Sequence, residues 1–341
     1  MKQSNKDITV NDYEYNLEFF LGGDYKFLLL MMGMKGATSI ACLWCKIAKD
    51  LRWRMGSTLD HYNSSPLRRT LEEMTKMSQK KGTQDIYSCE HEPLLKIELG
   101  HVVLDELHLL LRITDVLINN LVKEAVEWDK KDNFNKRKAD QKDSHIKMLQ
   151  STIQSCGVSF DIWEKTNADG KGSGQYDFTS LLGSDKKKLL SDLPEKLDTC
   201  VHKDTSQTVI QIWKDFHELY NIITSKNPSP DAVDQYFLKA KNWINLLTAL
   251  KDKHLGYKRA AVTPYMHSLV YHILGQGVEK NNDMARNVVL HKSNNQNAAA
   301  DVLKLESRQW ELCERERSKR TYSKKNLAYW DRNQRKKEKK R

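Results

Sequence analysis

Residues 13–45 read YEYNLEFFLGGDYKFLLLMMGMKGATSIACLWC, and this stretch decides the fold class. Over residues 13–21 apolar and polar side chains alternate, which is the period-two pattern of a half-buried β-strand. Gly22 and Gly23 are expected to end this strand. Residues 25–34 are apolar on nearly every side and largely unbranched, so they predict a buried helix.

Asp24 lies at the junction between this predicted strand and helix. Carboxylates that follow strands lie where α/β folds bind their ligands, so Asp24 is a candidate ligand for a divalent cation. An Asp that precedes a helix also commonly accepts hydrogen bonds from the first amides of that helix. The local sequence favours this capping role for Asp24.

Cys42 and Cys45 form a CxxC pair, and His267 and His272 follow more than two hundred residues later. Both spacings suit a tetrahedral zinc ion, because a CxxC turn chelates with two sulfurs and neutral imidazoles supply nitrogen ligands. Two other interpretations stay open, namely a redox-active CxxC and two ordinary core histidines. No thioredoxin-like βαβ pattern surrounds the cysteines, which disfavours the redox interpretation.

The five-residue step between His267 and His272 is awkward on a regular helix, because it rotates the side chain about 140° beyond a full turn. If both histidines bind one ion, one of them must lie at a helix end.

The rest of the chain is predicted to be mostly helical. Apolar periodicity predicts five further helices, at residues 99–130, 145–163, 205–225, 231–250 and 297–325. Asp231 is expected to cap the fourth of these. Residues 129–144 are charged and predict a linker, whereas residues 167–174 are glycine-rich and predict a surface turn. The expected fold class is therefore mainly α with a small α/β element.

Length and composition limit the class of protein. A chain of 341 residues can bury a substantial core, and its six scattered cysteines without a signal peptide indicate a reducing compartment. The longest apolar run, residues 27–34, is too short to span a bilayer. We therefore expect a soluble intracellular protein with no membrane partner and no small-molecule substrate.

Positive charge is concentrated at the C-terminal end. The formal net charge is +11, and residues 314–341 supply +9 of it through thirteen Lys or Arg and four acids. Such a segment indicates nuclear import or nucleic-acid binding, although a solvated helix end that maintains solubility remains an alternative. The residues expected to contact DNA are Trp330, Arg332, Arg335, Lys336, Lys337, Lys339, Lys340 and Arg341.

Taken in order, Asp24, the Cys42–Cys45 pair, His267, His272 and Glu279 resemble the catalytic core of Transib-type transposases and the related V(D)J recombinase catalytic subunit. The resemblance covers about residues 13–292 and depends on order and spacing. It implies an RNase H-like core interrupted by a large helical zinc-binding insertion. It also implies that Cys42, Cys45, His267 and His272 bind structural Zn²⁺, and that Asp24 and Glu279 are catalytic acids binding Mg²⁺ or Mn²⁺.

The sequence departs from this family in two places. Only twenty-three residues precede Asp24, too few for the strands that carry the family's first aspartate, and the connector between His272 and Glu279 is short. We therefore expect a partial RNase H-like strand–helix element in residues 1–40 and a zinc-binding helical insertion in residues 41–274. The C-terminal helix of the core is expected in residues 275–313, and the basic tail follows in residues 314–341.

The family chemistry is metal-dependent DNA cleavage and strand transfer. Because one acid is missing, we expect a transposase-derived, nuclear, DNA-binding protein that is incomplete and inactive, and that is able to form a homodimer. The alternative is a zinc-stabilised helical scaffold for protein–protein contact whose tail acts only as a nuclear-import signal.

Overall fold

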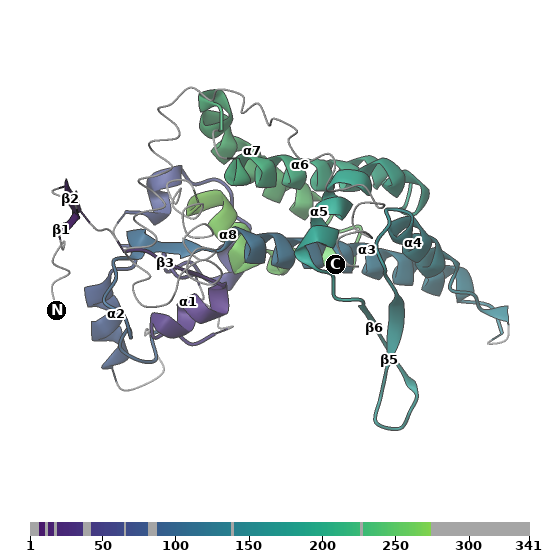
Figure 1. The fold of residues 1–341 in the computed structure, drawn as a ribbon. Helices are drawn as coiled ribbons and strands as arrows, with labels where there is room; N and C mark the ends of the chain where they lie inside the picture. The colour runs from purple at the N-terminus through teal and green to yellow at the C-terminus, as the bar shows by residue number, and fades with distance from the viewer. Residues whose placement is uncertain are drawn as a thin grey trace, which may run out of the picture. The chain divides into compact units, whose positions relative to one another are not determined.

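The computed structural model describes residues 7–10, 13–16, 19–36, 42–64, 66–80, 87–137, 140–225 and 228–273. The chain divides into two units, residues 1–280 and 281–341, and every described residue belongs to the first unit. Figure 1 follows the order of the elements, in which long helices dominate and strands are few and short. The prediction of a mainly helical protein with small sheets is confirmed.

The N-terminal strands pair with two different partners. β1 (Asp7–Val10) and β2 (Tyr13–Asn16) are antiparallel, whereas β3 (Leu21–Gly23) pairs in parallel with β4 (Val102–Leu104). The prediction of one strand over residues 13–21 is therefore wrong, because β2 and β3 are separate strands of separate sheets.

Gly22 and Gly23 are the last two residues of β3, so the glycine pair ends this short strand rather than a longer strand over residues 13–21. A Cβ atom on Gly23 would lie 2.6 Å from the ring of Phe27. The glycine therefore allows the helix after the strand to fold back closely against it.

The predicted helix after Asp24 is α1 (Tyr25–Met31), which ends three residues earlier than expected. Gly33 has a φ of +70°, a left-handed conformation that only glycine adopts easily, and it ends the helical path. Tyr25, Leu28 and Leu29 are buried, but Leu30 on the same helix is 64% exposed. The expectation of a helix buried all round is therefore wrong.

Short elements connect α1 to the helical body. They are η1 (Lys49–Leu51), η2 (Leu59–Tyr62), α2 (Leu71–Ser78) and η3 (Leu99–His101), followed by β4. The sequence predicted helix from residue 99, but residues 99–104 form η3 and β4 instead. The β-branched pair Val102 and Val103 is buried beside β3, which favours extended backbone there.

Helix α3 (Glu106–Asn133) is the longest element, and α4 (Ser144–Gln154) packs against it. The charged stretch at 129–144 is only partly a linker, because α3 continues to Asn133. Asp129 is buried and its carboxylate accepts the backbone N–H groups of His145 and Ile146 at 2.9 Å each. Asp129 thus fixes the start of α4.

The predicted helix at residues 145–163 is wrong beyond Gln154. Gly157 takes a φ of +72°, and the chain then forms the antiparallel hairpin of β5 (Ile162–Thr166) and β6 (Gly172–Phe178). The glycine-rich residues 167–174 include the tip of this hairpin, so the predicted surface turn is confirmed.

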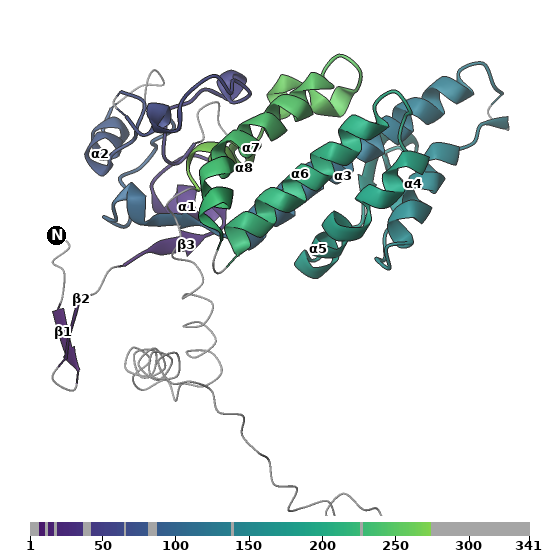
Figure 2. The same ribbon diagram turned by 90° about the horizontal axis from the view of Figure 1, so that it is seen from above.

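Four helices complete the described body, together with η5 (Pro194–Thr199), η6 (Leu255–Tyr257) and η7 (Arg259–Ala261). They are α5 (Gly183–Asp192), α6 (Ser206–Thr224), α7 (Pro230–Ala249) and α8 (Pro264–Tyr271). The helices predicted at residues 205–225 and 231–250 are present as α6 and α7, and Figure 2 shows them side by side. Ser229, rather than Asp231, caps α7 by accepting the N–H of Ala232.

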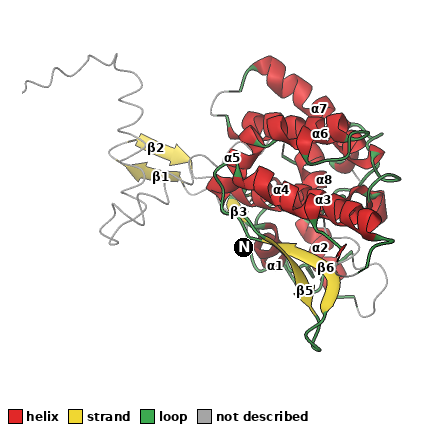
Figure 3. Cartoon of the chain, turned by 90° about the vertical axis from the view of Figure 1, so that its right-hand side faces the viewer, coloured by secondary structure: helices red, strands yellow, loops and turns green. Residues whose placement is uncertain are grey.

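The core continues from the strand–helix element into the helical body. Its largest fully buried side chains include Trp213, Trp243 and Tyr236, and it extends to Tyr25 and Leu28 of α1. Figure 3 shows how little of the chain is strand. No helix among the described residues is long and apolar enough to cross a membrane.

Candidate metal centre

The Cys42–Cys45 turn is held in place by hydrogen bonds from buried side chains. Arg69 donates Nε–H to the carbonyl oxygens of Cys42 at 2.9 Å and Cys45 at 3.1 Å. The Tyr25 hydroxyl accepts the N–H of Leu43 at 3.0 Å, and Trp44 donates Nε1–H to the Leu99 carbonyl at 3.1 Å. These bonds connect the turn to α1 and to the segment leading into β4.

His267 and His272 both come from one short helix, the first from its middle and the second from its C-terminal end. His267 lies within α8, whereas His272 is its C-cap residue and has left the helical conformation, with φ −127° and ψ −13°. One histidine was expected to lie at a helix end, and His272 does. Its non-helical backbone turns its ring toward that of His267. The two ring centroids are 5.2 Å apart.

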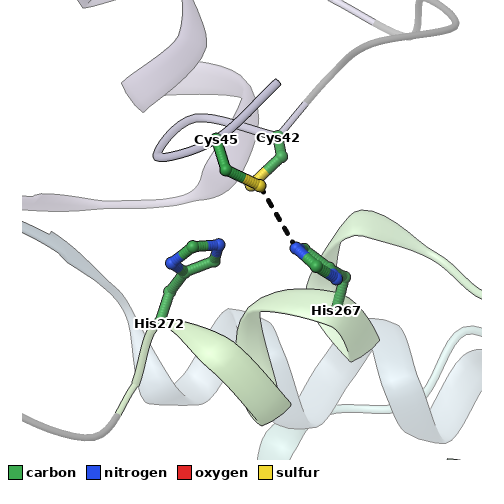
Figure 4. Close-up of side chains that lie close together, drawn as sticks. All are labelled: Cys42, Cys45, His267 and His272. Atoms are coloured by element: carbon green, nitrogen blue, oxygen red, sulfur yellow. Dashed lines mark hydrogen bonds between the residues drawn. The ribbon is translucent and has the colours of Figure 1, made fainter. Parts of the chain in front are cut away.

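The four side chains converge on one buried point (Figure 4). One ligand atom from each of Cys42, Cys45, His267 and His272 lies within 4.8 Å of the others. Cys45 Sγ is 3.3 Å from His267 Nε2, although the residues are 222 positions apart. We call these four residues the Cys2His2 cluster.

Two observations show that this cluster fits a metal ion. His272 Nε2 is buried and has no hydrogen-bond partner among the described residues, which is costly for a polar atom unless a ligand satisfies it. Trp44 stacks on the His272 ring, with centroids 5.4 Å apart, and fixes its orientation. Two sulfurs and two nitrogens are the donor set of structural tetrahedral sites.

The protonation of two members of the cluster suits metal binding, whereas burial and the neighbouring Cys42 hold the pKa of the Cys45 thiol well above its ordinary value. Burial raises the pKa of the Cys42 thiol, but the hydrogen bond with Cys45 and the imidazoles of His272 and His267 outweigh it and hold this pKa well below its ordinary value. Burial lowers the pKa of His267, so its imidazole is neutral. A thiolate and a neutral imidazole are the forms that bind metal ions.

The two acids that the resemblance implies, Asp24 and Glu279, are not brought together by the described structure. Asp24 follows β3, as the resemblance implies, but its Oδ1 accepts the N–H groups of Lys26 at 2.8 Å and Phe27 at 3.0 Å. The capping role favoured by the local sequence is therefore present in the structure. Glu279 lies outside the described residues, as do the predicted DNA-contacting residues from Trp330 to Arg341.

Sequence reasoning missed the role of Arg69 at the metal centre, and it placed Asp105 within a helix that in fact begins after it. Arg69 is 2% exposed, and nothing in its local sequence marks it as the donor that holds the CxxC turn. Asp105 follows β4 as Asp24 follows β3, and it caps α3 by accepting the N–H of Leu107 at 2.9 Å. The sequence did contain a signal for this role, because Asp105 and Glu106 follow a Val-Val-Leu run and acidic residues there favour a helix start.

The fold and the site together define a mainly helical protein with a buried Cys2His2 cluster that joins distant parts of the chain. No model of a known protein family matches this sequence, and no curated protein matches it.

Proposed function

We propose that this chain is a zinc-stabilised, nuclear, DNA-associating protein derived from a DDE-type transposase core. The supporting observation is the Cys2His2 cluster. It joins the segment that follows the β3–α1 unit to the segment that leads toward Glu279. A helical body inserted between two parts of a catalytic core needs such a junction. The parallel pairing of β3 with β4 and the packing of α1 beside them support a partial RNase H-like element.

Zinc is the metal that suits this donor set. Tetrahedral Zn²⁺ with sulfur at 2.3 Å and nitrogen at 2.0–2.1 Å places its ligand atoms about 3.3–3.8 Å apart. The 3.3 Å between Cys45 Sγ and His267 Nε2 lies in this range. The remaining separations, which reach at most 4.8 Å, require the side chains to move closer by about an ångström when the ion binds.

We propose DNA association without strand cleavage. Asp24 is the only acid implied by the resemblance among the described residues, and its Oδ1 already accepts two backbone amides. Two-metal chemistry requires several carboxylates arranged around two ions about 4 Å apart. The basic residues 314–341 supply the charge for DNA association.

Metal analysis tests the zinc proposal. Protein purified without chelator should contain one zinc ion per chain, and removal of the ion should lower the unfolding temperature markedly. Cys45→Ser should lose both the zinc and this stability. Cys200→Ala changes a buried cysteine outside the cluster and should keep the zinc. Absence of zinc from the wild-type chain would refute the proposal.

Salt-dependent DNA binding tests the association. The full chain should bind duplex DNA, and affinity should fall roughly 10³-fold between 50 and 200 mM salt if six to eight tail cations contact phosphates. Replacing the six cations between Arg335 and Arg341 with Gln should remove most of this dependence. If the wild-type chain does not bind DNA at low salt, the interaction-scaffold alternative becomes the better account.

A further inference from the structure

The Trp53 ring has two arginines near it, the adjacent Arg54 and the distant Arg259. The guanidinium carbon of Arg259 is 3.7 Å from the Trp53 ring centroid, and that of Arg54 is 5.7 Å from it. Trp53 follows η1, Arg259 begins η7, and these two short helices pack together. A stacked guanidinium keeps its N–H groups free at the edge of the ring, so Trp53 orients Arg259 without using its hydrogen-bond donors.

The surroundings of this stack are strongly cationic. Residues 49–54 and 258–259 together contain five Lys or Arg and one acid, Asp50. Four of these cations are exposed, and in the described part of the chain none forms an ion pair or a side-chain hydrogen bond: Lys49, Arg54, Lys258 and Arg259. Uncompensated cations held close together repel one another, so a polyanion stabilises such a surface.

The Cys2His2 cluster lies close in the sequence to both cationic segments. Trp53 lies eight residues after Cys45, and Arg259 lies eight residues before His267. The two segments also contact each other directly, through the packing of η1 on η7 and the stack of Arg259 on Trp53. A metal ion bound by the four ligands would therefore fix two points of the chain that lie close in sequence to these segments.

We propose that Lys49, Arg54, Lys258 and Arg259, ordered around Trp53, bind the phosphate backbone of DNA, and that metal binding assembles this surface. Planar guanidinium groups bind phosphate oxygens in a bidentate manner, and backbone contacts of this kind position a protein without reading sequence. A membrane surface fits less well, because none of the exposed large apolar side chains among the described residues lies in either segment. The inference deepens the proposed function and rests on it.

The test compares full-length variants by fluorescence anisotropy with a labelled 30-base-pair duplex over a salt series. Arg54→Gln/Arg259→Gln should weaken binding roughly tenfold and lower the slope of log affinity against log salt by about two. The matched control is Lys123→Gln/Lys147→Gln. It removes the same charge from exposed, unpaired positions on α3 and α4, and should leave the slope nearly unchanged.

Two further measurements test separately whether Trp53 orders the arginines and whether the metal assembles the surface. Trp53→Leu keeps every cation but removes the stack, so affinity should fall several-fold while the salt slope stays within the error of the wild type. Chelation of the metal should reproduce the loss seen with the double arginine variant, whereas the control variant should respond to chelation like the wild type.

The outcomes distinguish this inference from the proposed function. If the wild-type chain does not bind DNA, both fail. If it binds DNA and the arginine variant behaves like the control variant, the surface assignment alone is overturned. If chelation leaves affinity unchanged, the metal-dependent assembly is overturned. The double arginine variant is also tested on vesicles of anionic phospholipid. If it loses binding to the vesicles but not to DNA, the surface binds membranes and the inference is overturned.

Discussion

Asp24 and Asp105 occupy equivalent positions at the ends of two parallel strands. Their preceding residues, Gly23 and Leu104, are register partners, and the N–H of Asp105 donates to the Gly23 carbonyl at 3.1 Å. Each carboxylate caps the helix that follows it, α1 or α3. Asp105 also contacts His108 through its second oxygen. Two strand-to-helix junctions are therefore built in the same way and lie next to each other.

The Asp24 junction allows a test of capping against metal binding. Asp24→Ala should destabilise the protein by about 1 kcal/mol, because two amides of α1 lose their acceptor. Asp24→Asn retains an oxygen acceptor and should be nearly neutral. Chemical unfolding with and without Mg²⁺ checks this. If Mg²⁺ stabilises the wild type and not the Asn variant, the carboxylate binds a cation as well as capping the helix.

Loss of the Arg69 side chain should weaken both metal binding and folding, although Arg69 is not itself a ligand. Arg69→Met leaves the buried carbonyls of Cys42 and Cys45 without their donor, which should cost about 1–3 kcal/mol. Loss of such a supporting hydrogen bond typically lowers metal affinity about 10–100-fold. Competition with a chromogenic chelator measures this affinity. Retention of wild-type zinc affinity in this variant would show that the CxxC turn does not depend on Arg69.

The ion pair between buried Lys186 of α5 and half-buried Asp115 of α3 should respond asymmetrically to mutation. Lys186 is 2% exposed and donates to Asp115 and to the Leu111 carbonyl, whereas the Asp115 side chain is 35% exposed. Asp115→Ala leaves a buried ammonium group without its counter-charge and should cost about 3–5 kcal/mol. Lys186→Met should cost less, because water still reaches Asp115. Urea unfolding of both variants measures the two costs, and equal values would contradict this explanation.

His254 should make stability depend on pH. Burial lowers the pKa of its imidazole below 6.5, and the charges of His202, Lys131 and Lys253 lower it further. The unfolded chain therefore takes up this proton first as the pH falls below about 6.5. The stability contributed by His254 is complete above that pH and is lost as the pH falls through the lower, folded-state pKa.

The variant His254→Gln isolates this contribution. The difference in unfolding free energy between wild type and variant should shrink as the pH falls from 7.5 to 5.5, with a slope of at most about 1.4 kcal/mol per pH unit. The metal ligands titrate in both proteins, so their effect cancels in the difference. A difference that stays constant over this range would mean that His254 titrates alike in both states.

The sequence predicted well those features that depend on local periodicity or on ligand chemistry. Helices α6 and α7 carry apolar stripes, and Cys42, Cys45, His267 and His272 have spacings that suit a shared metal site. Even the placement of one histidine at a helix end followed from the five-residue step. These signals need no knowledge of which segments become neighbours.

Features that depend on pairing partners were not predictable in the same way. The period-two pattern at 13–21 was divided because β2 pairs with β1, whereas β3 pairs with β4, eighty residues downstream. Residues 155–163 were taken for the end of a helix, but α4 ends at Gln154, Gly157 takes a left-handed conformation, and Ile162 and Trp163 already belong to β5. Arg69 escaped notice because its role is set by the carbonyls it contacts, which belong to another segment.

The Cys2His2 cluster closes a loop of the polypeptide that contains most of the helical body. Its ligands enclose every residue between 46 and 266, so both ends of that segment meet at a single buried point. With a metal bound, tension applied to the chain on either side passes through the metal–ligand bonds and bypasses the helices between them. A single protease cut within the loop would likewise leave both fragments joined at the ion, so nicking alone would not release either part.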